Sequence, residues 1–374
     1  MNLLELRLHQ FRSWNHAVFR FGPGIIHILE GANAQGKTNI IEAIAYVSNL
    51  RSFRTRNVRD LVEHGKTGFS LDAVCEHGGI REPLRIHNEG GRKKLFRFGN
   101  TVPSFSQFVG TLNAVLFSPD DMMFFTGAPM QRRRFMDTEL VKLSAGYTSA
   151  LSACQKLLRD RNALLKKKNP DPVLLETCTA RLISLQKTVI TQRQGFADRL
   201  SEKLQQLYPV FSGGKEHLEI RYQTFVDTAK PLEPQMEHIY RKTLERDRRF
   251  CSTGEGVHKD DLVFLLNGYP MPAVSSQGQK RSALLSLKLA LCEIIREKTG
   301  EYPVFLLDDV FSELDPERRQ KLIELLPKTM QVFITAAEPV QADFEGRQVM
   351  VHQIRKESER KDEQHEPQRR NQTV

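Results

Sequence analysis

The stretch Gly31-Ala32-Asn33-Ala34-Gln35-Gly36-Lys37-Thr38 follows G-x-x-x-x-G-K-T, the pattern of a phosphate-binding loop. Its two glycines let the backbone curl so that successive amide N–H groups point at phosphate oxygens. Lys37 is placed to reach the β- and γ-phosphates of a nucleoside triphosphate, and the Thr38 hydroxyl is placed to hold Mg²⁺. The flanks agree, because an apolar β-branched run at 25–29 predicts a buried strand, and Ile40, Ile41, Ile44 and Val47 recur at helical spacing.

Composition narrows the class of protein. The chain has 374 residues, 40% hydrophobic and 27% charged, which is typical of a globular protein large enough for two structural units. No apolar run approaches the roughly 20 residues of a membrane helix, and the N-terminus carries no secretory signal. The five cysteines are scattered without a C-x-x-C pair, which argues against a zinc site and against a disulfide framework. We therefore expect a cytoplasmic protein with no membrane partner.

The net charge of +10 is unevenly spread along the chain. Residues 130–206 contain 15 Lys and Arg against 7 Asp and Glu, which accounts for most of the excess. A basic region of this size fits a polyanion, of which nucleic acid is the commonest. The other interpretation is a solvated helical surface that favours Lys over Glu.

The order of patterns along the chain predicts a head interrupted by a helical insertion. Strands at 3–8, 17–21, 69–75, 83–87 and 94–98 predict a mostly antiparallel β layer beside the phosphate loop. Two helices with matching apolar seams and a short polar link at 166–172 predict an antiparallel hairpin, either a protruding arm or helices packed on a globular core. We expect strands at 218–223 and 261–266 to resume the β layer. The expected divisions are 1–118, N-terminal head; 119–210, helical insertion; 211–354, C-terminal head; and 355–374, a disordered tail.

A second set of motifs completes a nucleotide site. The apolar strand expected at 303–307 ends in Asp308 and Asp309, and a buried strand that delivers a carboxylate to its tip is the usual way to hold Mg²⁺ in a phosphate-loop NTPase. Asp308 is then placed to contact the metal and Asp309 to polarise the attacking water, so Lys37, Asp308 and Asp309 are the candidate catalytic residues. Ser276-Gln277-Gly278-Gln279, before an apolar helix at 284–295, forms another anion-binding helix tip.

Taken in order, these motifs resemble the ABC-type ATPase head, an α/β fold with a phosphate-loop core and an antiparallel β layer. The S-x-G-Q signature is matched by Ser276, Gly278 and Gln279, and the S-x-L-D loop after the strand acids ends in Asp315. The resemblance implies ATP and Mg²⁺ as ligands. It also implies a head-to-tail homodimer in which Ser276, Gly278, Gln279 and Asp315 of one copy close in trans over the ATP held by the other, so that hydrolysis releases the dimer.

Two positions depart from that pattern. Asp309 stands where most ABC proteins carry Glu, so the base is one methylene shorter. Ala336 stands where transporters carry a switch His. Both departures imply a weak ATPase with slow turnover.

Further segments resemble the bacterial RecF family of DNA repair proteins, over about residues 3–335. They are Phe11-Arg12-Ser13, Arg51-Ser52-Phe53-Arg54, Phe117-Ser118-Pro119-Asp120-Asp121, Arg132-Arg133-Arg134-Phe135-Met136-Asp137 and His258-Lys259-Asp260-Asp261-Leu262. Lys259 replaces the Arg of the usual G-P-H-R-D-D, and a Lys is a point charge with no fork. The resemblance implies a DNA-stimulated ATPase that clamps single-stranded DNA and gapped or junction duplex. It also implies action with RecO and RecR in RecA loading, replication restart and SOS induction.

The predicted DNA contacts are Arg132, Arg133 and Arg134 of the helical insertion, with Arg51 and Arg54 near the nucleotide loop. The latter two belong to a cationic segment that is either a phosphate clamp or an ordinary surface loop. The alternative function is the nucleotide-binding subunit of an ABC transporter, against which Ala336 and the basic insertion count. A degenerate scaffold without hydrolysis is a further alternative, against which the presence of Lys37, Asp308 and Asp309 counts.

Overall fold

The computed structural model describes residues 1–344 and 346–355. Within them the chain divides into two compact units, which we call the head unit and the helical unit. The head unit comprises Met1–Pro119 and the chain from Gly300 on, and the helical unit comprises Asp120–Thr299. The return to the head, expected near residue 211, thus comes at Gly300. The expectation of a disordered tail falls almost wholly outside the described residues.

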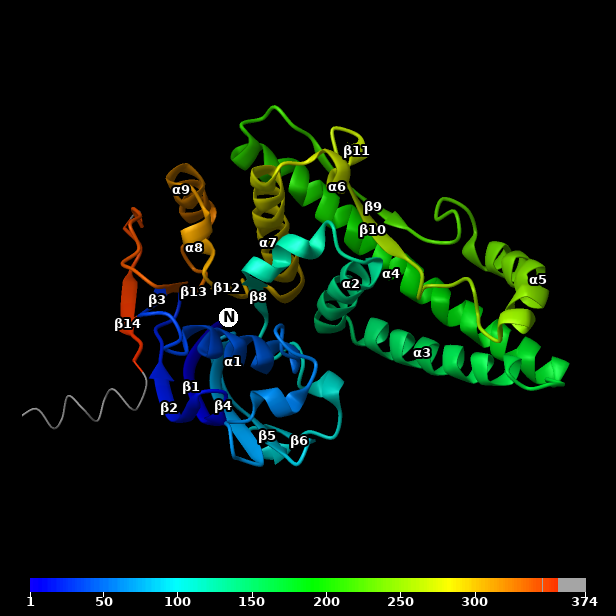
Figure 1. The fold of residues 1–374 in the computed structure, drawn as a ribbon, viewed down its shortest axis with the longest axis horizontal. Helices are drawn as coiled ribbons and strands as arrows, with labels where there is room; N and C mark the ends of the chain where they lie inside the picture. Colours follow the sequence, from blue (N-terminus) through cyan, green and yellow to red (C-terminus); the bar gives the residue numbers. More distant parts are fainter. Residues whose placement is uncertain (345, 356–374) are drawn as a thin grey trace, which may run out of the picture. The chain divides into compact units, whose positions relative to one another are not determined.

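A parallel sheet of five strands forms one layer of the head unit, in the order β14-β3-β13-β12-β8 (Figure 1). Every neighbouring pair in it is parallel. Its strands are β3 (Ile26–Glu30), β8 (Ala114–Phe117), β12 (Val304–Leu307), β13 (Val332–Ala336) and β14 (Val349–Gln353). The central strands β12 and β13 are buried throughout, because parallel sheets are covered on both faces and their strands are continuously apolar.

An antiparallel sheet of six strands forms the second layer, in the order β2-β1-β4-β5-β6-β7. Its strands are β1 (Asn2–Phe11), β2 (Trp14–Arg20), β4 (Gly68–His77), β5 (Ile80–Glu89), β6 (Arg92–Arg97) and β7 (Asn100–Thr101). Tight turns at Gly78-Gly79 and Gly90-Gly91 join β4 to β5 and β5 to β6, and all four glycines have positive φ, as two-residue hairpin turns require. The antiparallel β layer predicted for the first part of the chain is confirmed.

Helix α1 (Lys37–Asn49) lies between these two layers. It contacts β8 and β13 of the parallel sheet and β1 and β4 of the antiparallel sheet, and its isoleucines Ile40, Ile41 and Ile44 are fully buried. The helix that begins at the phosphate loop is therefore the centre of the head core. All of its residues from Ile40 to Ser48 are buried, so the helix is fixed firmly in the head core.

The helical unit is built on an antiparallel hairpin of α3 (Ala145–Leu165) and α4 (Pro172–Ser212) (Figure 1). Contacts from Cys178 Sγ to the Leu157 carbonyl and from Arg161 Nε to Thr179 Oγ1 show the antiparallel pairing. Helix α4 has 41 residues, a length of about 60 Å at 1.5 Å per residue. The other long helices are α2 (Pro129–Leu143), α5 (Leu232–Phe250) and α7 (Gln277–Thr299).

Strands β9 (Leu218–Gln223) and β10 (Asp261–Leu266) have the predicted bounds, but their placement was predicted wrongly. They do not resume the β layer of the head; with β11 (Tyr269–Pro270) they form a separate antiparallel sheet, β11-β10-β9, in the helical unit. The short elements are α6 (Met271–Val274), α8 (Val310–Glu313), α9 (Pro316–Leu325) and three 3₁₀ turns at Val58–Leu61, Phe105–Gln107 and Pro119–Phe124. None of the helices in the described part of the chain has the length and apolar character to cross a membrane.

Candidate functional site

The phosphate loop joins the end of β3 to the start of α1, and its glycines are required by close neighbours. Gly36 precedes α1 with φ of 98°, and a Cβ there would lie 2.9 Å from Trp14 Nε1 and 3.0 Å from Ser13 Oγ. A Cβ on Gly31 would lie 2.4 Å from the carbonyl oxygen of Ile354. The indole of Trp14, which the sequence did not mark as functional, thus supports the loop from behind and donates to the Gly36 carbonyl at 3.4 Å.

The Lys37 ammonium bends back over this loop. Its Nζ donates to the carbonyls of Gly31 at 2.6 Å and Ala32 at 2.8 Å, and the side chain is only 9% exposed. Burial lowers the pKa of Lys37, and the charges of Asp309 and Asp308 oppose that shift. The ammonium of Lys37 is therefore held at the phosphate loop by two carbonyl oxygens, which phosphate oxygens of a bound nucleotide would replace. The three residues at the crown of the loop, Asn33, Ala34 and Gln35, lie at the surface or partly so.

The structure brings Asp308 of the head's second half against Thr38 of its first half. Asp308 follows β12, is 4% exposed, and its Oδ1 accepts from Thr38 Oγ1 at 3.0 Å and from Thr335 Oγ1 at 2.9 Å. Burial raises the pKa of Asp308, while the two hydroxyl donors lower it. Residues 270 positions apart in sequence thus form one cluster of oxygen atoms, as the two motifs predicted.

Asp309 sits beside this cluster in an unusual backbone conformation. Its φ is 52°, in the left-handed region that Asp tolerates better than most residues, and its side chain is exposed. The backbone N–H of Asp309 donates to Thr335 Oγ1 at 2.8 Å, and its carboxylate accepts from Ser312 Oγ at 3.1 Å. Thr335 therefore bonds to both strand acids, a role that its position in an apolar run did not signal.

The donor set fits Mg²⁺. A carboxylate and a hydroxyl are hard oxygen ligands, and Mg²⁺ is usually held by one or two carboxylates together with substrate phosphates and waters. In the described part of the chain no three His, Cys, Asp or Glu side chains gather as a complete protein cage for a metal ion. The geometry therefore suits a cation that is shared with a triphosphate.

The signature residues lie in the helical unit at the start of α7. Ser276 and Gln279 form a capping box, because the Ser276 N–H donates to Gln279 Oε1 at 2.7 Å and the Gln279 N–H donates to Ser276 Oγ at 3.2 Å. Gln279 also donates to the carboxylate of Glu216. Gly278 leaves the first turn without a side chain, and both Ser276 and the N-terminal turn are accessible to a ligand from outside the unit.

Asp315 begins α9 as its N-cap. Its Oδ1 accepts from the Arg318 N–H at 2.9 Å, and its carboxylate pairs with the Arg318 guanidinium, which together lower the pKa of Asp315. Asp315, which the sequence predicted to contact the ATP held by another copy, thus caps a helix of its own chain. Its carboxylate is 44% exposed and stays ionised at neutral pH.

The arginines predicted to contact DNA are not equivalent. Arg132 is 9% exposed, and its Nε and Nη2 bind both carboxylate oxygens of Asp261 at 2.7 and 2.8 Å, which ties α2 to β10. Arg133 donates to the Asp260 carbonyl at 2.6 Å. Of the three, only Arg134 falls among the exposed residues. The spacing of three arginines on one helix did not show that the first is an internal ion-pair partner.

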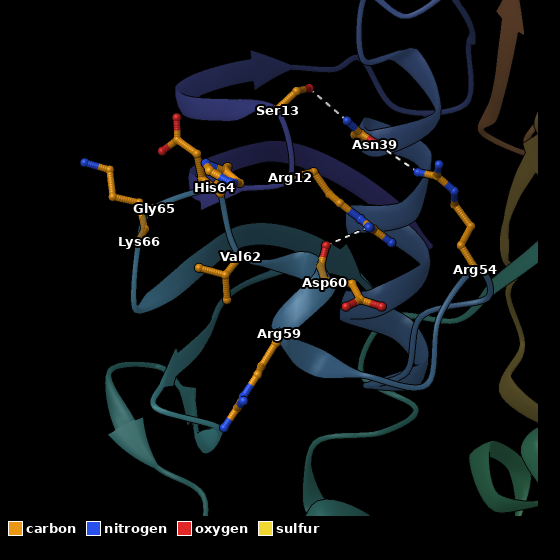
Figure 2. A pocket seen from close by; sticks show the side chains of 11 residues that line it. Arg12, Ser13, Asn39, Arg54, Arg59, Asp60, Val62, His64, Gly65 and Lys66 are labelled. Atoms are coloured by element: carbon orange, nitrogen blue, oxygen red, sulfur yellow. Dashed lines mark hydrogen bonds between the residues drawn. The ribbon is translucent and has the colours of Figure 1, made fainter.

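Arg54 lines an open pocket beside α1, whereas Arg51 is an exposed residue outside that lining (Figure 2). Arg54 Nη1 donates to Asn39 Oδ1 at 2.9 Å and lies 3.3 Å from Glu42 Oε2. Fully buried Glu42 also receives a bidentate pair from Arg12 at 2.7 and 2.8 Å. The pocket has a volume of about 630 Å³ and includes Asn39, the residue after Thr38, so it adjoins the phosphate loop.

Comparison with known proteins agrees with this geometry. The family model described as "RecF/RecN/SMC N terminal domain" matches residues 2–360. A solved head of an Smc protein bound to the C-winged helix domain of ScpA superposes with a TM-score of 0.55 at 16% identity, covering 95% of this chain and 94% of that one, which shows a shared fold. The fold and the site therefore define an ABC-type ATPase head of the RecF/RecN/SMC class.

Two curated relatives carry the name DNA replication and repair protein RecF. The protein of Bacillus subtilis (strain 168) is 34% identical over 356 residues, covering 92% of this chain and 95% of that one. The protein of Streptococcus suis (strain 05ZYH33) is 37% identical over 341 residues, covering 90% and 92%. A solved structure described as the recombination mediator RecF-ATP in the RecFOR pathway has a TM-score of 0.84 at 31% identity, covering 91% and 93%. The chain belongs to the RecF family of DNA replication and repair proteins.

Proposed function

We propose that the chain is an ATP-dependent DNA clamp of recombinational repair and replication restart. The observation that carries the proposal is the convergence of Lys37, Thr38 and Asp308 at the start of α1. Lys37 would give up its two carbonyl partners to bind the β- and γ-phosphate oxygens of ATP, and Thr38 and Asp308 would hold Mg²⁺, which would supply charge neutralisation for the triphosphate. Asp309 orients the attacking water through its exposed carboxylate.

The pocket lined by Arg12, Asn39 and Arg54 is the proposed place of the nucleoside. It adjoins the phosphate loop on the side of Asn39 and is rimmed by the exposed cations Arg59 and Lys66. Arg12 and Arg54 are held by buried Glu42, so their guanidinium groups are positioned before the ligand arrives. Preorganised donors of this kind lose little conformational entropy on binding.

ATP binding is proposed to join two copies. The accessible tip of α7 with Ser276, Gly278 and Gln279, together with Asp315, would close over the γ-phosphate held by the other copy, so that ATP stabilises the dimer and hydrolysis releases it. Asp309 in place of Glu, and Ala336 in place of a switch His, favour a slow, DNA-stimulated ATPase. Its hydrolysis rate would set how long the dimer stays closed.

The biological task rests on family membership. We propose that the dimer binds single-stranded DNA and gapped or junction duplex in the cytoplasm, with contacts that include Arg134, Arg51 and Arg54. With RecO and RecR it would promote RecA loading and SOS induction. The rival function, a transporter's nucleotide-binding subunit, is disfavoured by the match to RecF proteins over about nine-tenths of the chain.

Light scattering with ATP, with ADP and with a gapped duplex tests the proposal. Wild type is expected to shift from monomer to dimer mass with ATP and not with ADP, and Lys37→Met is expected to stay monomeric because its loop loses the charge that neutralises the phosphates. Lys328→Met, which removes an exposed head lysine away from the loop, is the matched control and should dimerise normally. A monomer under every condition, on DNA as well as off it, would contradict the clamp.

A further inference from the structure

The far end of the α3–α4 hairpin is a surface formed by three segments of the helical unit. Leu164 and Leu165 at the end of α3 pack in a buried cluster with Leu175 and Cys178 at the start of α4, and Leu244 of α5 packs against it. Two further links hold α5 and the segment after it to the hairpin: Arg161 Nη1 donates to Asp247 Oδ2 at 2.9 Å and the Thr253 N–H donates to Asn162 Oδ1 at 2.8 Å. We call residues 166–174 and 248–250, which surround this cluster, the arm tip (Figure 1).

The arm tip is strongly basic, and most of its cations lack carboxylate partners. It contains five Lys and Arg (Lys166, Lys167, Lys168, Arg248, Arg249) against one acid, Asp171. The three lysines and Arg249 are exposed, and among the described residues none of the four pairs with a carboxylate. The carboxylate of Asp171 is occupied as the N-cap of α4, where it accepts from the N–H groups of Val173 and Leu174 at 2.9 and 3.2 Å.

Some exposed cations elsewhere in the helical unit are paired with a carboxylate. Lys187 lies 3.1 Å from Glu233, Lys230 lies 3.1 Å from Asp227, and Arg221 pairs with Glu219 at 2.6 Å. The arm tip therefore concentrates positive charge that the chain itself does not neutralise, as expected of a surface that meets a polyanion.

Large apolar side chains stand among these charges. Phe250 is 66% exposed, Val173 is 71% exposed and Leu174 is 49% exposed. The Arg249 guanidinium lies 5.5 Å from the centre of the Phe250 ring. An exposed aromatic ring flanked by cations is the arrangement on which unpaired bases stack while their phosphates meet Lys and Arg, whereas duplex DNA offers no free base face.

We propose that the arm tip binds an unpaired segment of DNA, with Lys166, Lys167 and Lys168 on its phosphates and Phe250 stacked on a base. This inference rests on the proposed function, because it assumes that the protein binds DNA. It adds a second DNA contact, on the hairpin end, to the arginines predicted from the sequence. It also explains why charge and apolar surface are exposed together at the end of the hairpin.

Binding of the full-length protein to a fluorescent thymidine oligonucleotide and to a blunt duplex, with ATP over a salt series, tests the proposal. The variant Lys166→Gln/Lys167→Gln/Lys168→Gln is expected to weaken binding to the oligonucleotide about tenfold or more and to lower the slope of log affinity against log salt by about 2, since each phosphate contact on a single strand contributes about 0.7. The control Lys187→Gln/Lys230→Gln/Arg221→Gln removes the same charge from paired sites and should leave both unchanged.

Two changes at Phe250 test the stacking contact separately. Phe250→Ala is expected to weaken oligonucleotide binding about fivefold or more with no change in salt slope, and to leave duplex binding unaltered. Phe250→Trp adds a second tryptophan to a chain whose only one, Trp14, is 2% exposed, and its fluorescence should be quenched by the oligonucleotide. Phe105→Trp, at a 40% exposed position of the head unit, should not respond.

The outcomes separate the arm tip from the clamp. If wild type binds DNA and both arm-tip variants bind it with the same affinity, the inference is overturned and the proposed function stands. Equal losses on oligonucleotide and duplex, with no effect at Phe250, would overturn the stacking contact. Vesicles of anionic lipid are tested in parallel. If wild type binds them and the arm-tip variants lose that binding while they keep their DNA affinity, the surface meets a membrane and the inference is overturned. A wild type that binds no DNA would instead contradict the proposed function.

Discussion

Thr335 is the residue on which both strand acids of the nucleotide site depend. Its Oγ1 donates to Asp308 Oδ1 at 2.9 Å and accepts from the Asp309 N–H at 2.8 Å, so one hydroxyl fixes a carboxylate and the backbone that follows it. The side chain is 2% exposed, which means that water cannot easily replace these bonds. We infer that Thr335 is a positioning residue for the metal-binding carboxylate.

Thr335→Val keeps the shape of the side chain and removes both hydrogen bonds. We expect the Mg²⁺ concentration needed for half-maximal ATP binding to rise about fivefold, equivalent to about 1 kcal/mol, because Asp308 is then held by Thr38 alone. Titration of a fluorescent ATP analogue with Mg²⁺ measures this. Thr335→Ser restores the hydroxyl and should restore the wild-type titration; a Mg²⁺ dependence that is the same in all three proteins would rule out the positioning role.

His27 makes the stability of the head unit depend on pH. The ring is fully buried on β3, and its nitrogens face His352 Nε2 at 3.0 Å and the Gly22 carbonyl at 3.1 Å. Burial lowers the pKa of His27 to about 4, and the neighbouring His352, whose pKa burial also lowers, adds to this shift. The unfolded chain takes up the proton near pH 6.5, whereas the folded chain resists it until about pH 4.

The free energy of unfolding is therefore expected to fall as the pH drops from 6.5 to 4, by up to about 3 kcal/mol from this histidine. Urea unfolding at pH 7.0 and pH 4.5 measures the difference. His27→Gln should be less stable than wild type at pH 7 but should lose less on acidification. Equal losses in the two proteins would show that other groups carry the pH dependence.

Among individual residues, the sequence predicted those in contiguous motifs and missed those that hold the motifs in place. The glycines, Lys37 and Thr38 stand in one recognisable stretch, and Asp308 follows an apolar strand, so local pattern was enough. Trp14 and Thr335 act through contacts with residues far away in the sequence, and no local pattern marks them. Arg132 looked like its two neighbours because charge alone does not distinguish a buried ion pair with Asp261 from a surface contact.

Elements were predictable wherever periodicity was strong and their pairing was local. The hairpin helices, the antiparallel strands and the helix after the phosphate loop follow this rule. Strand β8 has four residues and β14 is an edge strand with three exposed apolar residues, so neither shows a clear alternation. Strands β9 and β10 were found but assigned to the wrong sheet, because strand pairing across 37 intervening residues leaves no trace in either segment.

Helix α5 is fastened to the hairpin by a buried ion pair that interrupts an apolar seam. Arg161, at one seam position of α3, is 0% exposed, and its Nη1 binds Asp247 Oδ2 at 2.9 Å and Thr253 Oγ1 at 2.6 Å. The ring of Tyr240 lies 5.1 Å from the Arg161 guanidinium. A cation at this depth is tolerated only because its partners are in place.

Asp247→Ala is expected to destabilise the helical unit by about 3–5 kcal/mol, because it leaves the Arg161 charge buried without a carboxylate. Chemical denaturation followed by circular dichroism measures the loss. Glu233→Ala, on the same helix as Asp247, breaks the exposed pair with Lys187 of α4; it is the control and should cost less than about 1 kcal/mol. Similar small effects of both changes would show that Asp247 is not needed to hold α5.

For the molecule as a whole, the proposed cycle requires that ATP binding and hydrolysis have opposite effects on the dimer. Asp309 is the residue that separates them. Its carboxylate is exposed and accepts from Ser312, whereas phosphate and metal are assigned to Lys37, Thr38 and Asp308. Removing the charge of Asp309 should leave nucleotide affinity intact and stop the step that ends the closed state.

Asp309→Asn is therefore expected to bind ATP like wild type but to remain dimeric at least about tenfold longer after a chase with excess ADP, since each 1.4 kcal/mol added to the hydrolysis barrier slows it tenfold. Size-exclusion chromatography with light scattering at timed intervals follows the decay. Asp315→Asn provides the contrast: its carboxylate caps α9 and is assigned to the partner's ATP, so that variant should weaken dimer formation and not prolong it. If Asp309→Asn loses ATP affinity, Asp309 belongs to the binding site; if its dimer decays at the wild-type rate, hydrolysis does not end the closed state.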